Sequence, residues 1–316
     1  MMNSMFVKWI MMGFVFCFGA NTYGQFAVAG AKKSKSEFCF PKLKQVDYEN
    51  LKKCITYFVC PEQLLIDRGS LQILLDKSWD YTEIVVIGNN ELKDYIGKEN
   101  AAFFDINILS SSITIQDIYM ELATLGEKGV RYARFNLNFN CKMQDIFKKQ
   151  GSDDLFAYFN SEADILNLKP GIIANYLKLI NTKLEDQEFI DCQSKIENVS
   201  ELKKLGKDTL YITDNAKTKY LSKALKFGCE TDLENDAEKL MDRYPFVYKI
   251  ISFDELSDKI IKGDEFYYTL CIKSQDNVKH ISVFKSITGE CVYNSVSTGA
   301  QFRNDDFGKI ARLVER

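Results

Sequence analysis

Histidine is nearly missing from this sequence, since His280 is the only one among 316 residues. This scarcity removes most routes to a Ser-His-acid triad, a Cys-His dyad or a multi-histidine zinc site. The glycine-rich turns that hold nucleotide phosphates are missing too, because neither G-x-G-x-x-G nor G-x-x-x-x-G-K-[ST] follows a predicted first strand. The net charge of -3 gives no basic footprint for nucleic acid. We therefore expect no cofactor, no metal site and no nucleic-acid partner.

Long hydrophobic runs are also scarce. The longest, Trp9 to Ala20, has only about a dozen residues, whereas a helix that spans a bilayer needs roughly 20. With Lys8 before it and small residues after it, this run predicts an export signal over residues 1–24 that is cleaved before Gln25. We expect a flexible N-terminal arm at 25–45 and a mature chain without a transmembrane segment, located in the periplasm or outside the cell.

Cysteine pairs with C-x-x-C spacing are missing, so thioredoxin-like redox chemistry and a zinc knuckle lose their usual sequence support. Removal of the signal leaves these cysteines: Cys39, Cys54, Cys60, Cys141, Cys192, Cys229, Cys271 and Cys291. An exported chain is free to form disulfides, but a chain of this length has core enough without them. Because a buried thiol behaves as a small hydrophobe, we expect burial rather than bridging for most of these cysteines.

The sequence does contain an approximate internal repeat. The stretch "LLDKSWDYTEIVVIGNNELKDYI" at 74–96 returns as "LMDRYPFVYKIISFDELSDKII" at 240–261. Further matches follow in the same order: 51–59 with 205–213, and Phe103-Phe104 with Tyr267-Tyr268. Ordered matches in one direction indicate a duplicated module, which we place at 46–165 and 196–316.

Both modules have the hydrophobic pattern of alternating strands and helices. Short β-branched and aromatic runs predict strands at "ITYFV", "YTEIVVI" and "AAFFDINI", then at "TLYIT", "VYKIISF" and "EFYYTLCI". Segments with helical spacing separate these strands, and such alternation implies βαβ units. The expected fold class is α/β: two tandem related βαβαβ modules with mostly parallel sheets and antiparallel edge hairpins, joined by an amphipathic helix.

Three further features complete the predicted architecture. The run "HISVFKSITGECVYN" is typical of an antiparallel hairpin that turns at Thr288-Gly289. Strict alternation from Phe135 to Cys141 predicts a half-exposed strand near a sheet edge. The linker at 166–195 contains the amphipathic helix, which begins at Pro170-Gly171 and is expected to pack on one or both modules. Its apolar stripe consists of Ile173, Tyr176, Ile180 and Leu184.

A family resemblance enters through the second module. Four segments carry it: "DTLYIT", "YPFVYKIISFDELSDKI", "FYYTLCIKS" and "ISVFKSITGECVYNS". They resemble a recurring pattern of exported proteins with tandem α/β modules from Bacteroidota-type bacteria, in which a "TGE" turn closes the final hairpin and no activity is assigned. The first module matches more loosely, through "KSWDYTEIVVI", and has no "TGE" hairpin. The resemblance implies an exported bacterial protein and carries no site residues.

Polar residues follow several predicted strands, at the place where open α/β sheets bind ligands. They are Gly88-Asn89-Asn90, Asp214-Asn215 and Asp254-Glu255. Residues of these types also cap helices and form turns, and we favour that structural interpretation. Two acid pairs, Asp153-Asp154 and Asp305-Asp306, could serve a hydrolase, although adjacent acids are more often solvated loop residues.

Histidine and aromatic side chains are the remaining candidates. The sequence shows no catalytic partner beside His280, so a structural role is favoured there. Rings that precede the second strand of each module could form a sugar- or peptide-binding platform: Trp79, Tyr81, Tyr244, Phe246 and Tyr248. Their repetition at matching positions favours core packing instead.

The leading functional hypothesis is an exported, non-catalytic binding or interaction protein of the bacterial envelope. Its partner would be an envelope protein, a peptide or a glycan, and no catalytic residue is assigned. One alternative is a carboxylate-dependent hydrolase of envelope material, which needs a cleft with converging acids of raised pKa. Another is an envelope assembly or stress factor, which would have an exposed apolar patch or an unprotected sheet edge.

Overall fold

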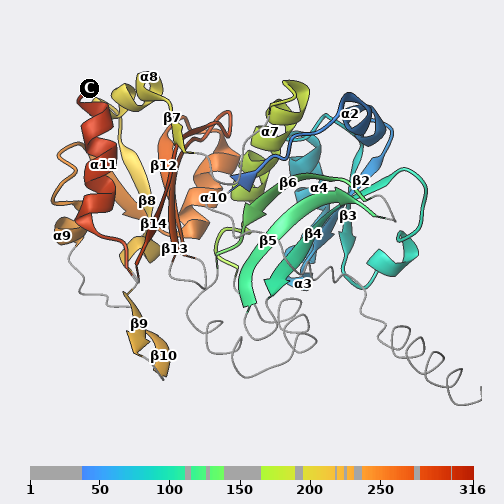
Figure 1. Cartoon of the computed structure of the whole chain (residues 1–316), viewed down its shortest axis with the longest axis horizontal. Coiled ribbons are helices and arrows are strands. Elements are labelled where there is room, and N and C mark those ends of the chain that lie inside the picture. Colours follow the sequence, from blue (N-terminus) through green and yellow to red (C-terminus); the bar gives the residue numbers. More distant parts are fainter. Residues whose placement is uncertain are drawn as a thin grey trace, which may run out of the picture.

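The computed structural model describes residues 38–110, 115–125, 129–138, 165–188, 195–217, 219–223, 226–230, 237–273, 278–299 and 301–316. Over these ranges the chain is a mixed α/β protein with two large mixed sheets, which stand side by side in Figure 1. The predicted export signal 1–24 and the acid pair Asp153-Asp154 lie outside the described residues. No helix within the ranges given above has the length and apolar content needed to cross a bilayer.

The first sheet has the strand order β1-β6-β5-β4-β2-β3. Its strands are β1 (Phe38–Cys39), β2 (Ile55–Cys60), β3 (Ile84–Gly88), β4 (Ala101–Ser110), β5 (Ile115–Thr124) and β6 (Arg131–Asn136). β2 is parallel to its neighbours β3 and β4, whereas β4, β5, β6 and β1 form antiparallel pairs. The predicted N-terminal arm ends inside the fold, because β1 pairs with β6 and α2 (Gln45–Leu51) begins at the last residue of the arm.

Both faces of the first sheet are covered by the connections between its parallel strands. These connections are α3 (Glu62–Leu65), α4 (Arg68–Asp76) and η1 (Leu92–Asp94). Alternate side chains of β2 point to opposite faces, so Phe58 packs with Leu75 of α4 while Tyr57 packs with Leu92 of η1. The near-continuous apolar run of β2 is the sequence signature of such two-sided burial.

The second sheet has the strand order β11-β8-β12-β13-β14-β7. Its strands are β7 (Ile196–Glu197), β8 (Leu210–Thr213), β11 (Tyr248–Ile251), β12 (Tyr267–Lys273), β13 (Val278–Lys285) and β14 (Cys291–Thr298). Its helices are α8 (Val199–Leu202), η2 (Lys203–Gly206), η3 (Asp214–Lys217), α9 (Ala237–Met241), α10 (Phe253–Lys262) and α11 (Asn304–Val314). β9 (Lys219–Lys223) and β10 (Lys226–Glu230) form a separate antiparallel hairpin that projects from the body in Figure 1.

The prediction of mostly parallel sheets is wrong, because only β2 and β8 have parallel neighbours on both sides. The remaining pairs in both large sheets are antiparallel. A parallel crossover needs a dozen or more residues, and the segments that join β4 to β5, β5 to β6, β12 to β13 and β13 to β14 are too short for one. The predicted turn at Thr288-Gly289 is confirmed, with Gly289 at a left-handed φ of 69°.

The predicted half-exposure of the strand at 135–141 is also wrong for its described residues, although the strand does lie near a sheet edge, beside the two-residue β1. The described part of that segment belongs to β6 and the residues after it, and Asn136 and Asn138 are as buried as Phe135 and Leu137. Asn138 Nδ2 donates a hydrogen bond of 3.1 Å to the carbonyl oxygen of Cys271 in the second sheet. The alternation therefore marks which side chains are polar but not which are exposed, and the hydrogen bond to Cys271 compensates burial of the Asn138 amide.

Helix α7 (Pro170–Glu185) begins at the predicted proline and lies between the two sheets (Figure 1). Its predicted apolar stripe is buried, but so are residues on its other sides, including Asn175 and Asn181. A helix that is buried nearly all round is more than a linker, because both sheets use it as a packing surface.

Close contacts hold α7 to the second half of the chain. The backbone N–H of Gly171 donates to Ser257 Oγ of α10 at 2.9 Å. On the other side, Gly289 at the tip of the β13–β14 hairpin sits directly on the carbonyl oxygen of Asn175. A Cβ atom at Gly171 would collide with the carbonyl oxygen of Ser257, and one at Gly289 would collide with the carbonyl oxygen of Asn175.

One aromatic series crosses from the first half to the second. Phe135 stacks on Tyr176 with ring centroids 4.1 Å apart, and Tyr176 meets the edge of Phe284 at 6.0 Å. Phe284 in turn stacks on Tyr268 at 5.2 Å. Side chains of both sheets and α7 thus belong to one buried cluster.

Thiol burial is confirmed where the described residues test it. Cys54, Cys60, Cys271 and Cys291 are buried and unbridged. Burial raises the pKa of the Cys54 and Cys60 thiols, which keeps them protonated and unreactive. Two of the other predicted thiols, Cys141 and Cys192, lie outside the described residues.

Candidate functional site

The strand ends singled out from the sequence are occupied by structural hydrogen bonds. At Gly88 the backbone N–H donates to Glu91 Oε2 at 2.6 Å, and Arg68 binds the same carboxylate at 3.0 Å. Both contacts lower the pKa of Glu91, with the backbone hydrogen bond the larger cause. In the second half Glu255 closes a capping box with Ser252, at 3.1 Å in each direction. These polar residues form turns and caps, as the structural interpretation predicts.

The third strand end, Asp214-Asn215, is equally committed to the fold. Asn215 Nδ2 donates to the carbonyl oxygen of Cys271 at 2.5 Å, which ties η3 to β12. Burial raises the pKa of Asp214, and the backbone N–H of Asn215 opposes that rise. The Asn215 amide is buried, and its Oδ1 atom has no hydrogen-bond partner among the described residues.

The acid pair Asp305-Asp306 is divided between two environments. Asp305 is exposed and forms an ion pair with Arg243. Asp306 is buried, accepts from Lys279 Nζ at 2.5 Å and also accepts from Ser297 Oγ at 3.3 Å. The two carboxylates therefore point to different partners and cannot act together on one substrate bond.

His280 and Lys273 are titratable groups buried in the second sheet. Both ring nitrogens of His280 lack a hydrogen-bond partner among the described residues, and burial lowers its pKa to about 4. Its cross-strand neighbours are Ile272 and Val296, so the ring is a neutral core side chain. Burial, followed by the charge of Lys279, lowers the pKa of Lys273 to about 8.

The aromatic residues that precede the second strands are packing residues. Trp79 is 3% exposed, meets the edge of Phe104 at 5.5 Å and donates from Nε1 to Thr82 Oγ1 at 3.0 Å. Tyr81 and Tyr244 are buried as well, and Phe246 packs edge-on against Tyr244 at 5.5 Å. The preference for core packing over a binding platform is confirmed for these rings.

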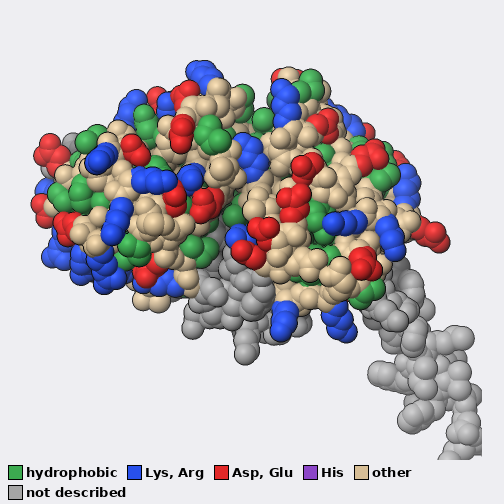
Figure 2. All heavy atoms as spheres, turned by 90° about the horizontal axis from the view of Figure 1, so that it is seen from above, with side chains coloured by type: hydrophobic (Ala, Val, Ile, Leu, Met, Phe, Trp, Pro, Cys, Tyr) green, Lys and Arg blue, Asp and Glu red, His purple; other side chains and the backbone are tan. Residues whose placement is uncertain are grey.

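An open pocket of about 700 Å³ lies at the amino ends of β8 and β12. Its lining combines charged and aromatic side chains: Lys204, Asp208, Thr209, Tyr211, Lys259, Asp264, Glu265, Phe266, Tyr267 and Lys285. Figure 2 shows that Lys/Arg and Asp/Glu side chains are interspersed over the surface of the second half. Sequence reasoning missed this pocket, because it considered only the carboxyl ends of the strands.

Glu201 of α8 organises one wall of the pocket. It binds Lys204 at 2.8 Å, accepts from the Tyr267 hydroxyl at 2.8 Å and pairs with Lys285 at 3.2 Å. These contacts, with the Lys204 hydrogen bond the largest cause, lower the pKa of Glu201 to about 2. Burial and the Glu201 carboxylate together raise the pKa of Tyr267. Both groups therefore keep a fixed protonation state around neutral pH.

Lys259 organises the opposite wall. Its Nζ binds Asp264 at 2.6 Å and lies 5.2 Å from the ring centres of Tyr211 and Phe266. The hydrogen bond to Asp264 is the main reason that the pKa of Lys259 is raised. This arrangement presents fixed charges beside aromatic carbon, which suits recognition of a polar ligand with an apolar part.

A second cluster of polar residues lies on the η1-facing side of the first sheet. Asp105 of β4 is the cross-strand neighbour of Glu121 of β5, and burial raises the pKa of Asp105 to about 7. Burial also raises the pKa of Glu121, although Arg131 lies 3.4 Å from its carboxylate. Nothing in the sequence indicated that Glu121 on this face would be buried and Asp105 half-buried.

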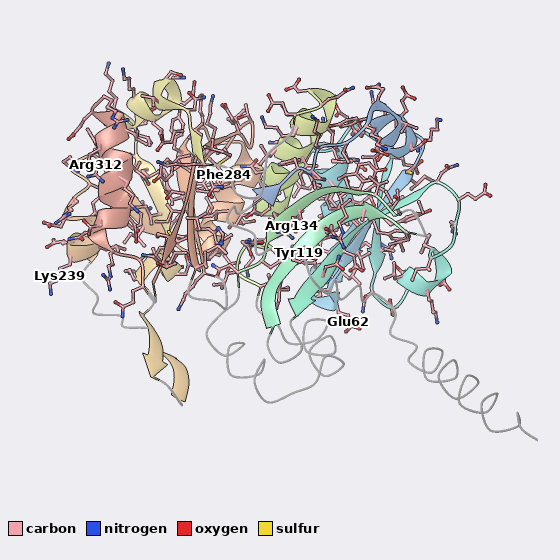
Figure 3. The ribbon with its side chains drawn as sticks, in the orientation of Figure 1. Glu62, Tyr119, Arg134, Lys239, Phe284 and Arg312 are labelled. Atoms are coloured by element: carbon pink, nitrogen blue, oxygen red, sulfur yellow. The ribbon has the colours of Figure 1, made fainter. Side chains whose placement is uncertain are left out.

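Basic and aromatic side chains accompany these acids. Arg134 of β6 lies over the Tyr119 ring at 4.9 Å, and Figure 3 shows the two labelled side chains on adjoining strands. The Asn107 Oδ1 atom is buried without a hydrogen-bond partner among the described residues. No group of three or more His, Cys, Asp or Glu side chains suited to a metal occurs in the part of the chain that the structure covers.

The chain matches no family model, no curated protein and no solved structure. The assignment of function therefore depends on the geometry described above.

Proposed function

We propose that this chain is an exported, non-catalytic binding protein of the bacterial envelope and that the pocket at the amino ends of β8 and β12 is its ligand site. The predicted export signal over residues 1–24 and the resemblance to exported Bacteroidota-type proteins support the location. The ligand would be a peptide or glycan fragment small enough for a pocket of about 700 Å³.

The observation that carries the proposal is the set of ion pairs that fix the charged side chains of the pocket, with Lys204 and Lys285 bound to Glu201 and Lys259 bound to Asp264. The pKa of Glu201 is lowered to about 2, and the pKa values of Lys259 and Lys285 are raised. A general acid or base works best with a pKa near the operating pH, and these shifts all move away from it. Fixed charges suit the recognition of complementary groups on a ligand.

Affinity capture tests this proposal. The immobilised chain is exposed to an envelope extract, and retained peptides and glycans are identified by mass spectrometry. We expect the double variant Lys259→Met, Lys285→Met to retain roughly tenfold less ligand, because each lost ammonium group removes a charge-assisted contact that the pocket would make with the ligand. Lys183→Met, which removes a lysine of α7 and its ion pair with Glu188, is the matched control and should retain as much as the unmodified chain. Equal retention by the double variant would exclude the pocket.

We further propose that the two halves arose by duplication. The strand orders correspond position by position, from β1 and β7 at one edge to β3 and β11 at the other, and the pairing directions correspond as well. Tyr57 pairs with Phe103 on the face covered by η1, and Tyr211 pairs with Tyr268 on the face covered by α10. The structural correspondence therefore aligns Phe103 with Tyr268, whereas the sequence alone aligned Phe103 with Tyr267.

A hydrolase is the second candidate function, and Asp105 is the observation that favours it. A carboxyl with a pKa of about 7 beside a second carboxyl at Glu121 is a pattern typical of acid–base catalysis. Both acids lie on the η1-facing side of the first sheet, away from the contact between the two halves at Gly171 and Ser257.

Product release from purified envelope polysaccharide and peptide tests the hydrolase. Asp105→Asn and Glu121→Gln should each abolish release if these groups transfer protons. Asp94→Asn changes an exposed acid on η1 and serves as the control. Absence of any cleaved product with the unmodified chain would remove this candidate and leave the binding protein.

A further inference from the structure

Exposed sheet edges are the places where a β protein can accept another strand, and proteins protect them by shortness, charge or cover. The edges of the two large sheets are β1, β3, β7 and β11. β1 and β7 are each only 2 residues long. The edges long enough to pair with another chain are therefore β3 in the first sheet and β11 in the second.

Side chains of α4 close the β3 edge. Gln72 Nε2 donates to the carbonyl oxygen of Ile84 at 2.8 Å, and Gln72 Oε1 accepts from the N–H of Val86 at 2.8 Å. Arg68 Nη2 donates to the carbonyl oxygen of Val86 at 2.5 Å. These backbone groups point away from β2, so the hydrogen bonds that a new strand would need are already made.

No side chain of the described residues closes the β11 edge in this way. Val247 accepts from the N–H of Leu210 at 3.0 Å, which shows that alternate residues from Val247 onward turn their backbone groups toward β8. The backbone groups of Tyr248 and Ile250 consequently point outward. Among the residues that the structure places, β11 has β8 as its single neighbour, and nothing bonds to the N–H or C=O of Tyr248 or Ile250.

The side chains along β11 are partly accessible and include one lysine. Val247 is 62% exposed, and Lys249 is exposed with no ion pair among the described residues. Lys249 lies opposite Tyr211, whose ring is the one that Lys259 approaches. On the other face the side chains of Tyr248 and Ile250 pack partly against the second core.

We propose that β11 binds an extended segment of another protein, which adds to the second sheet as a new edge strand. Backbone groups of Tyr248 and Ile250 would supply the hydrogen bonds. A carboxylate side chain of the incoming strand would face Lys249, and apolar side chains would extend the face of Tyr248 and Ile250. This inference is independent of the ligand pocket, and it supports a role in envelope protein assembly beside ligand binding.

Charge decides between a foreign segment and a second copy of the chain. Two copies of β11 paired about Lys249 would place two lysines directly opposite each other, which is destabilising. An incoming strand with an acidic side chain opposite Lys249 would instead be attracted to the lysine. The unpaired lysine therefore disfavours self-association and selects an acidic partner.

Hydrogen exchange measured by NMR tests the proposal with capped hexapeptides of alternating valine and glutamate, or of alternating valine and lysine. We expect the valine–glutamate peptide at millimolar concentration to slow exchange of the Tyr248 and Ile250 amides at least roughly tenfold, and the valine–lysine peptide to have little effect. Unchanged exchange of both amides with the acidic peptide would overturn the proposal.

Two variants make the test specific. Lys249→Glu should reverse the preference between the two peptides, whereas Lys93→Glu, the same charge change at an exposed site on η1, should leave it unaltered. Ile250→Pro removes an outward-pointing donor at a place where an edge strand tolerates proline, and it should abolish protection at Tyr248. A preference for the acidic peptide that survives Lys249→Glu would contradict the proposed strand addition, whether or not the proline variant folds.

Discussion

The backbone of Gly171 at the start of α7 lies against the carbonyl oxygen of Ser257 in α10, and its N–H donates to Ser257 Oγ at 2.9 Å. Both helices would have to separate to admit a methyl group there. We expect Gly171→Ala to lower the free energy of unfolding by about 1–3 kcal/mol, the usual cost of overpacking. Chemical denaturation measures the change.

Gly69→Ala is the control for that substitution. Gly69 lies in α4, where a Cβ atom would have no neighbour within 4 Å, and alanine is the better helix former. The substitution should raise the free energy of unfolding by up to about 1 kcal/mol. Equal effects at the two glycines would show that the α7–α10 contact is unimportant for stability.

Gly289 combines a left-handed backbone with a close contact to Asn175. Gly263, which ends α10, has a similar backbone with φ of 79° but open space around it. Alanine at Gly263 should cost about 1–2 kcal/mol from the backbone alone, and alanine at Gly289 should cost clearly more. The difference, measured by urea unfolding, isolates the docking of the hairpin on α7. A smaller loss at Gly289 would contradict that docking.

Neighbouring aspartates should respond differently to the same substitution. Asp306→Asn leaves the buried ammonium of Lys279 without its counter-charge, and we expect a loss of about 3–5 kcal/mol. Asp305→Asn breaks only an exposed ion pair with Arg243 and should cost less than about 1 kcal/mol. Thermal unfolding of the two variants distinguishes them. Similar melting temperatures would contradict the conclusion that the Asp306–Lys279 ion pair is buried and the Asp305–Arg243 ion pair is exposed.

Stability should fall as the pH rises through the titration of Asp105. Its pKa is 3.8 when unfolded and about 7 in the folded chain, so folding takes up a proton between these values. The contribution of this group is therefore fully present below about pH 4 and is lost as the pH approaches 7. Denaturant midpoints measured between pH 5 and pH 7 should show this slope in the unmodified chain.

Asp105→Asn should flatten that slope, because the amide does not titrate. The remaining slope reports other carboxyls such as Glu121, whose pKa is also raised. An undiminished slope in the variant would mean that Asp105 is not the group responsible.

The sequence was sufficient to locate the parallel strands of both sheets and the β13–β14 hairpin, but it did not reveal β5 (Ile115–Thr124) in the middle of the first sheet. The β-branched and aromatic runs around Phe58 and Ile212 are strands because burial on both faces demands near-continuous apolar residues. The sequence did not reveal that the sheets combine parallel and antiparallel pairs. The composition of β4 and β12 does not show that the chain reverses direction after each of them and pairs antiparallel with the next strand.

Site prediction failed where the deciding contacts come from distant parts of the chain. Glu201 and Lys285 are far apart in sequence, and their pairing depends on α8 lying over the amino ends of the second sheet. Asp305 and Asp306 look alike in the sequence, and only the position of Lys279 on β13 separates them. The structural roles of His280 and Trp79 were predicted correctly. The lack of catalytic partners in the sequence around His280 and the size of the Trp79 ring are local features of the sequence.

Shared use of α7 has a consequence for synthesis on the ribosome. The helix closes the first core and then offers its other side to α10 and the β13–β14 hairpin, both made later. A nascent chain released after residue 185 would expose an apolar surface until its C-terminal half arrived. Chaperones that hold unfolded chains would find a binding surface there, and premature stop codons beyond that point should yield insoluble fragments.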